Sequence, residues 1–367
     1  MEIRPYTREM EPHVKAFNER LRFGGEHRWK LPETHVLRFT KPQDTLPYQE
    51  FFLTCDQDEI RGGYQLTHTL FTLRGSPTWI ACGPQYNISE GIVNRSYGMV
   101  GVVHVQDALQ RQPLMYALGM GGLNEPQAKL LSAMKWNILP VPFFFRVVNV
   151  SRFLANIVYL RRSKRNRVIL DSARYTGVGW LGVHVAQARL PKRDTSIQAE
   201  PVSEFGSWAD SIWDRSKGTY SFAAFRNCAN LNALYPSSSS RFIRLKISRS
   251  PGNVGWAVVL DTQMSKHKQF GDMRVGTIVD CLAHPECAGD VIRGCTTFLE
   301  ERGVDIIVSN QASSQWGQAF APAGYLKGPT NFFLATSTML TKHLEPLRMS
   351  QPGIHMNRGD GDGPIHL

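Results

Sequence analysis

The sequence predicts a mixed α/β fold built from two related units. The chain has 367 residues, and because a domain usually takes about 100 to 200 residues, two domains are expected. Hydrophobic residues make up 42% of the chain and charged residues 20%, which is typical of a globular protein and excludes a largely disordered one. Strands followed by helix, strand, helix and strand occur in each half, which favours two α/β units over one open sheet.

The first half opens with a strand and a helix. Residues 2–6 are strand-like, and residues 10–21 carry apolar side chains at helical spacing. Runs rich in aromatic and β-branched residues then predict strands over 35–39, 48–55 and 60–73. The elements expected next are an extended segment over 78–94, a helix over 102–109, a strand over 115–120, a helix over 125–134 with Asn124 as its N-cap, and an extended stretch over 140–150.

The second half repeats this order after a basic segment. Residues 151–201 contain the run RRSKRNR (161–167) and are expected to connect the two domains. The elements expected beyond it are helices over 205–213, 222–234, 289–302 and 315–321 and strands over 241–248, 255–263, 273–283, 304–310 and 331–337. The predicted organisation is a first domain over 1–150, the basic connector over 151–201, a second domain over 202–345 and a flexible Gly/Pro/Asp-rich tail over 346–367.

Charge and cysteine usage narrow the class of protein. There are 42 Lys and Arg against 31 Asp and Glu, a net charge of +11, and this favours anionic partners such as nucleotides, phosphates, nucleic acid or an acidic membrane. The six cysteines contain no CxxC pair, so neither a metal site nor a redox motif is expected. The polar N-terminus does not resemble a signal peptide, and the most apolar stretch is interrupted by Pro and Arg. A cytoplasmic protein is therefore expected.

Several segments, taken together, resemble the GNAT superfamily of acyl-CoA N-acyltransferases. They are the Ile3-Arg4-Pro5-Tyr6 strand with its helix, RSYGMVG (95–101) opening a helix, ALGMGGLNEPQAKLLSAMKW after the next strand, GWAVVLDTQ, and the Gly324-Tyr325 corner. The resemblance covers most of the chain as a tandem pair, similar to the Fem peptidoglycan aminoacyltransferases and to bacterial N-acyltransferases of nucleotide-linked amino sugars. It implies two GNAT-like domains, each with a mixed, mostly antiparallel sheet flanked by helices.

The resemblance also implies where a cofactor binds. The superfamily's phosphate loop reads Arg/Gln-x-x-Gly-x-Gly/Ala, and Arg95 and Gly98 fit it, whereas Val100 replaces the final small residue. A helix N-terminus offers unpaired N–H groups and a favourable dipole to a diphosphate. In the second half, Glu286 and Asp290 stand at the matching place and would repel phosphate. Acetyl-CoA or another acyl-CoA is therefore expected on the first domain, bound by Arg95, Ser96, Tyr97, Gly98, Met99, Val100, Gly101 and Asn124.

The sequence offers several candidates for the catalytic groups. Many members of the superfamily use a Tyr as general acid, but Leu131 and Ser132 stand at its place here, and Tyr97 is a candidate substitute. His68, Glu90 and His104 are candidates for the base, because His titrates near pH ~6.5 and suits removal of an amine proton. Alignment of an amine with a thioester can itself supply about 7–11 kcal/mol, so a strong base is not required.

The sequence leaves three functions open. The first is acyl transfer from acyl-CoA to an amine on an amino sugar or other cell-envelope or polysaccharide precursor, including a nucleotide-linked one. The second is a Fem-like transfer from aminoacyl-tRNA, and the third is a non-catalytic binding or scaffold role. The basic run 161–167 is interpreted as a solvated linker, as an anion clamp, or as a peripheral membrane contact. No sequence-specific nucleic-acid binding is expected, since no such motif accompanies the charge.

Overall fold

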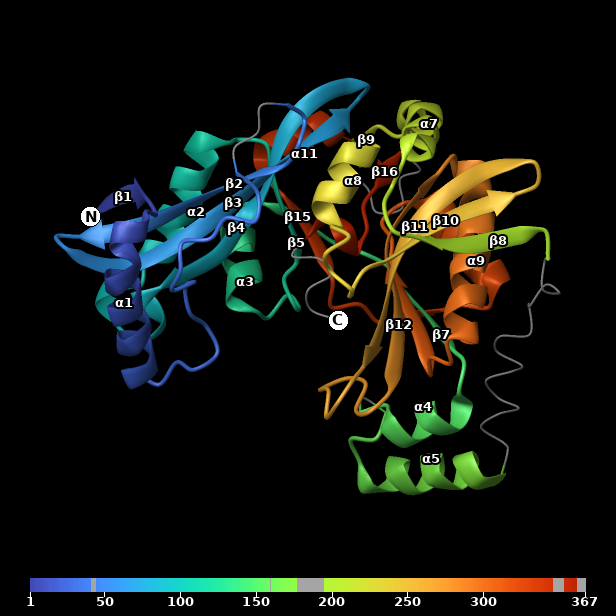
Figure 1. Ribbon diagram of the computed structural model, residues 1–367. Coiled ribbons are helices and arrows are strands. Elements are labelled where there is room, and N and C mark those ends of the chain that lie inside the picture. The colour runs from blue at the N-terminus through green and yellow to red at the C-terminus, as the bar shows by residue number, and fades with distance from the viewer. Residues whose placement is uncertain (41–43, 159, 177–194, 346–352, 362–367) are drawn as a thin grey trace. The chain divides into compact units, whose positions relative to one another are not determined.

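The computed structural model describes residues 1–40, 44–158, 160–176, 195–345 and 353–361. The chain forms two compact units: unit 1 comprises Met1–Leu139 and Phe333–Leu347, and unit 2 comprises Pro140–Phe332 and Arg348–Leu367. Each unit has a mixed sheet flanked by helices (Figure 1), which confirms the predicted fold class. The parts of the predicted connector and tail at 159, 177–194, 346–352 and 362–367 lie outside the described residues.

The sheet of unit 1 has the strand order β1-β2-β3-β4-β5-β15-β6. Strand β4 pairs with β5 in parallel, whereas β1-β2, β2-β3, β3-β4 and β5-β15 are antiparallel. The strands are β1 (Glu2–Pro5), β2 (Tyr48–Asp56), β3 (Glu59–Leu73), β4 (Ser76–Ser89), β5 (Met115–Gly119), β6 (Asn137–Pro140) and β15 (Phe333–Thr336). The helices are α1 (Glu11–Phe23), α2 (Val100–Arg111), α3 (Pro126–Ala133) and α11 (Thr338–Leu344), with short 3-10 turns η1 (Arg8–Met10), η2 (Glu90–Ile92) and η3 (Arg95–Tyr97).

Helices cover both faces of this sheet. Successive side chains of a strand point to opposite faces, and in β2 both faces are apolar. Phe51 and Leu53 pack with Val14, Phe17 and Leu21 of α1. Phe52 packs in a second core with residues of α2 and α3, which are Val105, Ala108 and Leu131. The sheet therefore holds α1 on one face and α2 and α3 on the other.

The sheet of unit 2 has the strand order β14-β7-β13-β12-β11-β10-β8, in which β12 and β13 are parallel. These strands are β7 (Phe143–Val147), β8 (Ile197–Val202), β10 (Ile243–Arg249), β11 (Gly252–Gln263), β12 (Arg274–Ala283), β13 (Ile306–Asn310) and β14 (Leu326–Gly328); β9 (Phe222–Ala224) pairs with β16 (Ile354–His355). The helices and 3-10 turns are α4 (Val150–Asn156), α5 (Lys164–Thr176), α7 (Ser207–Ser216), α8 (Cys228–Leu234), α9 (Ala288–Glu301), α10 (Ser314–Phe320), η4 (Lys217–Thr219), η5 (Pro285–Cys287), η6 (Ala321–Ala323) and η7 (Arg358–Asp360). None of the described helices has the length and apolar character needed to cross a membrane.

Two strands belong to the sheet of one unit although the predicted domain ranges placed them in the other domain. Strand β15, from the range expected for the second domain, lies between β5 and β6 of unit 1. Strand β7, from the range expected for the first domain, lies between β13 and β14 of unit 2. An apolar strand pattern shows that a segment is buried in a sheet but not in which sheet. The prediction therefore grouped β7 and β15 with the elements next to them in the sequence.

Other segments also differ from expectation. Residues 35–39 form no strand, since β1 already pairs with β2 at Phe52–Cys55. The helix expected over 222–234 is divided into β9 and α8, because the Asn227 side chain caps a helix that begins only at Cys228. Residues 353–361, expected to be part of a flexible tail, are packed in unit 2 with Asp360 buried. All six cysteines are free thiols.

Candidate functional site

The loop between β4 and α2 contains the sequence-predicted phosphate site. After η2, Asn94 accepts a hydrogen bond from the Ser96 N–H at 3.1 Å, and this bond starts η3. The Gly98 N–H closes the turn on the carbonyl of Arg95 at 3.1 Å. The chain then enters α2 at Val100. Residues 95–99 are thereby held in a compact turn at the N-terminus of a 12-residue helix.

Backbone donors at the helix entrance are available to a ligand. In the described part of the chain, no protein group accepts a hydrogen bond from the N–H of Met99, Val100 or Gly101, as is usual for the first turn of a helix. Arg95 and Met99 are exposed, whereas the Val100 side chain points into the core and is 1% exposed. The entrance is therefore open to solvent, with a cationic side chain nearby and the positive end of the helix dipole behind it.

Strands β4 and β5, which precede and follow this loop and α2 in the chain, pair over a short distance. Their parallel ladder joins Ala81 to Met115 and Cys82 to Tyr116, and β4 then continues to Ser89, where the turn toward α2 begins. On α3, Gln127 donates a hydrogen bond to the carbonyl of Pro84 at 3.0 Å. From residue 83 to Ser89, β4 therefore continues beyond its pairing with β5 toward the turn that leads to α2.

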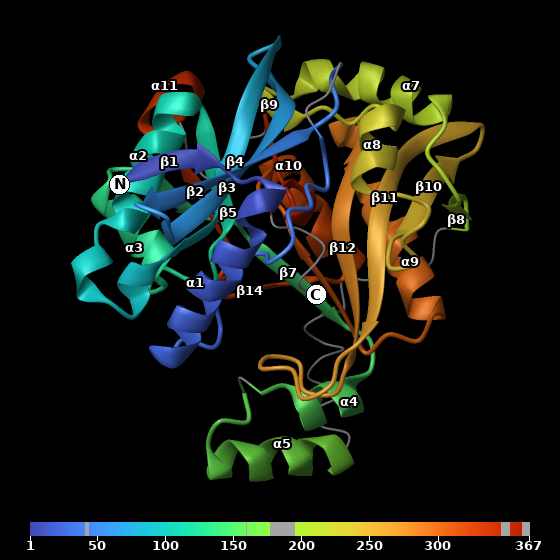
Figure 2. The same ribbon diagram turned by 60° about the vertical axis from the view of Figure 1, so that its left-hand side comes forward.

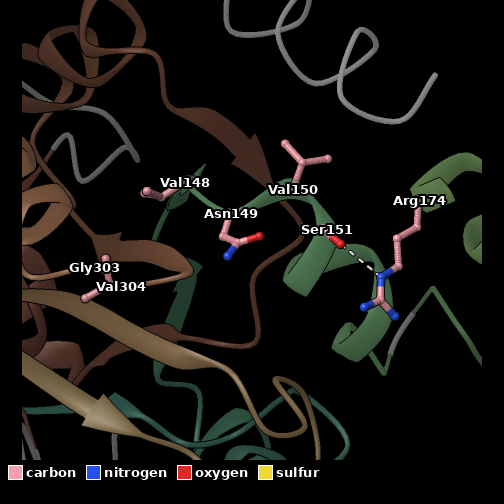
Figure 3. A pocket seen from close by; sticks show the side chains of 7 residues that line it. All are labelled: Val148, Asn149, Val150, Ser151, Arg174, Gly303 and Val304. Atoms are coloured by element: carbon pink, nitrogen blue, oxygen red, sulfur yellow. Dashed lines mark hydrogen bonds between the residues drawn. The ribbon is translucent and has the colours of Figure 1, made fainter. Parts of the chain in front are cut away.

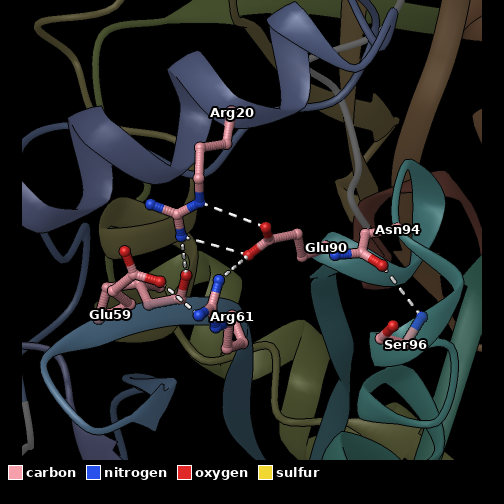
Figure 4. Close-up of polar contacts among 7 residues, drawn as sticks. Arg20, Glu59, Arg61, Glu90, Asn94 and Ser96 are labelled. Carbon is pink, nitrogen blue, oxygen red and sulfur yellow. Dashed lines mark hydrogen bonds and ion pairs between the residues drawn. The ribbon is translucent and has the colours of Figure 1, made fainter.

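An ion-pair network fixes the start of the loop (Figure 4). The Glu90 carboxylate, 7% exposed, accepts hydrogen bonds from Arg20 at 3.3 and 3.2 Å and from Arg61 at 2.9 Å. Arg61 also pairs with Glu59, and its guanidinium carbon lies 4.3 Å from the centre of the Tyr97 ring. Glu90 and Arg61 therefore tie η2 and η3 to α1 and β3.

Close backbone packing completes this anchor. Gly91 lies so near the turn that an added Cβ would stand 2.6 Å from the Tyr97 carbonyl oxygen and 2.8 Å from the Gly98 Cα. Only glycine allows this approach. Neither Arg20 nor Arg61 was identified from the sequence, because both lie far from the loop along the chain and belong to no motif.

His68 lies elsewhere in unit 1. Its ring is 3% exposed, stacks on Tyr48 with ring centres 4.3 Å apart, and has its Nε2 2.9 Å from a carboxylate oxygen of Glu50. Its Nδ1 has no hydrogen-bond partner in the part of the chain that the structure describes. On β3, His68 is six residues from Gly62, which pairs with Ser89 next to Glu90, or roughly 20 Å at the strand rise per residue. The structure does not bring His68 and Glu90 together.

Asn124 is exposed and precedes α3 by two residues. The N-cap of this helix is Glu125 rather than the expected Asn124, and Glu125 makes no side-chain capping bond. The shift follows from Pro126, whose fixed φ and missing N–H suit the first helical position. Asn124 keeps its predicted place next to the helix that follows β5.

His104 is buried among hydrogen-bond partners on α2. Its Nε2 lies 2.7 Å from the Thr54 hydroxyl and its Nδ1 2.8 Å from the Asn87 side-chain oxygen, and the residue is 0% exposed. Burial lowers the pKa of His104 to about 4. A group so enclosed holds α2 to the sheet and does not reach a bound substrate.

His104 gives unit 1 a pH-dependent stability. An unfolded His titrates near pH ~6.5, so between pH 6.5 and about 4 only the unfolded chain takes up this proton, and stability falls as the pH is lowered through this range. His104→Gln is expected to weaken that dependence by up to about 1.4 kcal/mol per pH unit. Thermal unfolding of both proteins at several pH values measures it, and an unchanged pH dependence would contradict the assignment.

The corresponding place in unit 2 is filled by the chain itself. The parallel ladder of β12 and β13 ends at Ile278 and Ser309. Beyond it, Asn310 accepts a hydrogen bond from Arg358 at 2.9 Å, and Asp280 accepts one from Asn357 at 2.8 Å. At the entrance of α9, the Asp290 carboxylate pairs with Arg249 at 2.9 Å and with Arg293 at 2.6 Å.

Two cavities of unit 2 contain none of the predicted site residues. One, of about 480 Å³, is lined by Val148, Asn149, Val150, Ser151, Arg174, Gly303 and Val304 (Figure 3). There Arg174 donates a hydrogen bond to the Ser151 hydroxyl at 2.9 Å. The other, of about 340 Å³, includes Arg215, His284 and Cys287 in its lining. Within the described ranges, no three His, Cys, Asp or Glu side chains come together as a metal site would require.

A known structure shares this fold, although no protein-family model and no curated protein matches the sequence. A probable N-acyltransferase from Enterococcus faecalis V583 is 8% identical, with a TM-score of 0.52 over 94% of this chain and 74% of that one. Eis1 from Mycobacterium abscessus is 13% identical (TM-score 0.46, 92% of this chain and 74% of that one). A tandem GNAT protein from the clavulanic acid biosynthesis pathway is 11% identical (TM-score 0.45, 92% and 98%). The first likeness shows a shared fold, in agreement with the resemblance drawn from the sequence.

Proposed function

We propose that this chain, which shares its fold with a probable N-acyltransferase, transfers an acyl group from acyl-CoA to an amine. The observation that supports this most is the entrance of α2, where the N–H groups of Met99, Val100 and Gly101 have no protein acceptor among the described residues. A diphosphate is the ligand that such a helix entrance suits. Arg95, exposed on the same turn, adds a cation for it.

Unit 1 is the proposed site of acyl-CoA. Its helix entrance lacks acidic residues in the first turn, whereas α9 of unit 2 has Asp290 in its first turn, where it already binds the two neighbouring cations, Arg249 and Arg293. Beyond the parallel ladder of unit 2, the strand residues Asp280 and Asn310 are bound by Asn357 and Arg358 of the C-terminal segment. Ser96, Gly98 and Asn124 complete the proposed contacts to the cofactor.

The reaction proposed is direct attack of an amine on the thioester. The nitrogen forms a bond to the acyl carbon, the carbon–sulfur bond breaks, and the CoA thiol leaves with the proton that the amine gives up. Holding amine and thioester together can lower the barrier by about 7–11 kcal/mol. A proton acceptor typically raises the rate 10²–10⁴-fold, which corresponds to a smaller reduction of the barrier. Positioning by the chain is therefore the main proposed contribution.

Three residues are candidates for moving the proton. His68 has an Nδ1 without a hydrogen-bond partner in the described chain, and Tyr97 lies on the loop itself. Glu90 is held by Arg20 and Arg61 and would have to leave both cations to accept a proton. The acceptor amine is proposed to belong to an amino sugar or another cell-envelope or polysaccharide precursor, in keeping with the net charge of +11 and with an anionic, nucleotide-linked molecule.

Thermal unfolding with CoA, acetyl-CoA, longer acyl-CoAs or no ligand tests the donor. A ligand at 100 times its Kd stabilises the folded protein by about 2.7 kcal/mol, so a saturating rise in melting temperature is expected with CoA species. Release of free thiol on adding candidate amines then measures turnover. If no CoA species shifts the melting temperature, the acyl-CoA proposal is wrong and aminoacyl-tRNA becomes the donor to test; binding without thiol release would favour a non-catalytic role.

A further inference from the structure

Helices α4 and α5 form a hairpin attached to unit 2 through one side only. In α4, Val150, Phe153 and Leu154 pack in a core with residues of β12 and β13, to which α5 adds Leu170 and Ala173. In both views α5 is the outermost helix of this group, with α4 between it and the sheet (Figures 1 and 2). The remaining surface of α5 faces solvent.

The outward surface of α5 combines cations with apolar side chains. Lys164 and Arg165 are exposed, and Val168 and Ile169 are 66% and 53% exposed. Residues four apart lie next to each other on a helix, so Lys164 adjoins Val168 and Arg165 adjoins Ile169. An amphipathic surface of this kind has cationic groups beside side chains that gain by leaving water.

Helix α5 contains more basic than acidic residues. The helix has Lys164, Arg165, Arg167 and Arg174 but only one acidic residue, Asp171, and both of its carboxylate oxygens bind Arg161 at 2.7 and 3.1 Å. In contrast, α1 alternates Glu11 and Glu19 with its basic residues. The outward surface of α5 is therefore not balanced by acids of its own helix.

The turn between β11 and β12 extends the basic surface. Lys266 and Lys268 are exposed on it, and the turn is tied to the end of α4 because the Val158 N–H bonds to the carbonyl of Gln269 at 3.1 Å. Val158 and Leu160, in the connection between α4 and α5, are each 39% exposed. Cations and apolar groups thus occur together on neighbouring segments of unit 2.

We propose that this surface, which we define as Val158, Leu160, Lys164, Arg165, Val168 and Ile169 with Lys266 and Lys268, docks unit 2 on an anionic lipid membrane. Negatively charged headgroups complement the cations, and the acyl boundary accepts Val168 and Ile169. An acidic protein or nucleic acid would also complement the charge, but two exposed aliphatic side chains between cations favour a lipid surface. This inference is independent of the acyl-CoA proposal, because it uses no residue of unit 1.

Co-sedimentation with vesicles tests the docking. The full-length protein is expected to bind phosphatidylcholine vesicles containing phosphatidylserine, to bind pure phosphatidylcholine weakly, and to release as salt rises. The double variant Lys164→Glu/Arg165→Glu is expected to bind roughly 30-fold more weakly at least, from the usual contribution of each surface cation. Val168→Ser/Ile169→Ser is expected to bind roughly 10-fold more weakly, from the loss of inserted apolar area.

A matched control separates local from overall charge. Lys15→Glu/Arg22→Glu on α1 changes the net charge by the same amount at exposed positions and should bind vesicles like the parent protein. Equal loss in this control would overturn the proposal in favour of non-specific attraction. If the serine variant binds unchanged while the glutamate variant does not, the surface recognises a polyanion such as nucleic acid or an acidic protein, and the membrane proposal is wrong. Unfolding of each variant confirms that it is folded.

Discussion

Replacing Arg226 with Met is expected to lower the free energy of unfolding of unit 2 by about 3–5 kcal/mol. Arg226 lies between two carboxylates, 2.9 Å from Asp280 and 2.5 Å from Asp360, and the three side chains are between 0% and 3% exposed. Without the guanidinium, the two buried carboxylates lose the cation that lies between them. Removing one partner of a buried pair is costly because the charge that remains is neither hydrated nor neutralised.

The carboxylate of Asp280 has further partners besides Arg226. Asp280 accepts further hydrogen bonds from Tyr235 at 2.6 Å and from Asn357 at 2.8 Å. An added Cβ on Gly359 would stand 2.8 Å from an Asp280 oxygen and closer still to the Tyr235 hydroxyl. The C-terminal segment is thus closely packed around Asp280.

Scanning calorimetry of Arg226→Met measures the loss, expected as a fall in melting temperature on the order of 10 °C. Arg302→Met is the matched control: Arg302 also pairs with an aspartate, Asp261 at 2.7 Å, but is 42% exposed, and such pairs contribute about 0–1 kcal/mol. The triple variant with Asp280→Asn and Asp360→Asn should recover part of the loss, since it removes the stranded charges. Equal melting of the Arg226 and Arg302 variants would contradict this account.

Local patterns in the sequence predicted most elements of both sheets. Runs of aromatic and β-branched residues predicted β2 and β3, and helical spacing predicted α1, because each of these signals arises from neighbours in the chain. The residue pattern of a strand does not show which other strand it pairs with. Strands β7 and β15 carry apolar runs that any buried sheet would accept, so their membership of the other unit's sheet was not readable from order alone.

The C-terminal segment shows that an ion pair between residues distant in the sequence is likewise not predicted by local patterns. Its Gly, Pro and Asp content is typical of mobile tails, yet Asp360 is ordered by Arg226, which is 134 positions away in the sequence. At the loop before α2, where the structure has the turn η3 followed by α2, the motif predicted the turn that opens a helix. It did not give Arg20 and Arg61, which hold Glu90, since an ion pair between distant segments leaves no periodic trace.

Reversing the charge of this loop is expected to weaken the binding of CoA strongly. Arg95→Glu replaces an exposed cation by an anion, and Gly98→Glu adds a second anion where α2 presents its unpaired N–H groups. A hydrogen bond to a charged group contributes about 1.5–3 kcal/mol, so loss of that contact together with repulsion should weaken binding at least about 100-fold. At a CoA concentration 100 times the original Kd, stabilisation would fall from about 2.7 to about 0.4 kcal/mol.

Melting curves with and without CoA measure this effect. The matched control is Arg22→Glu/Gly218→Glu, which makes the same two substitutions at exposed positions, one of them a glycine whose Cβ would meet nothing within 4 Å. The control should retain the full CoA-induced shift, and both variants should melt near the parent protein without ligand. If the loop variant keeps the shift, the amides at the start of α2 do not hold the diphosphate, and CoA must be sought on other residues even where the parent protein binds it.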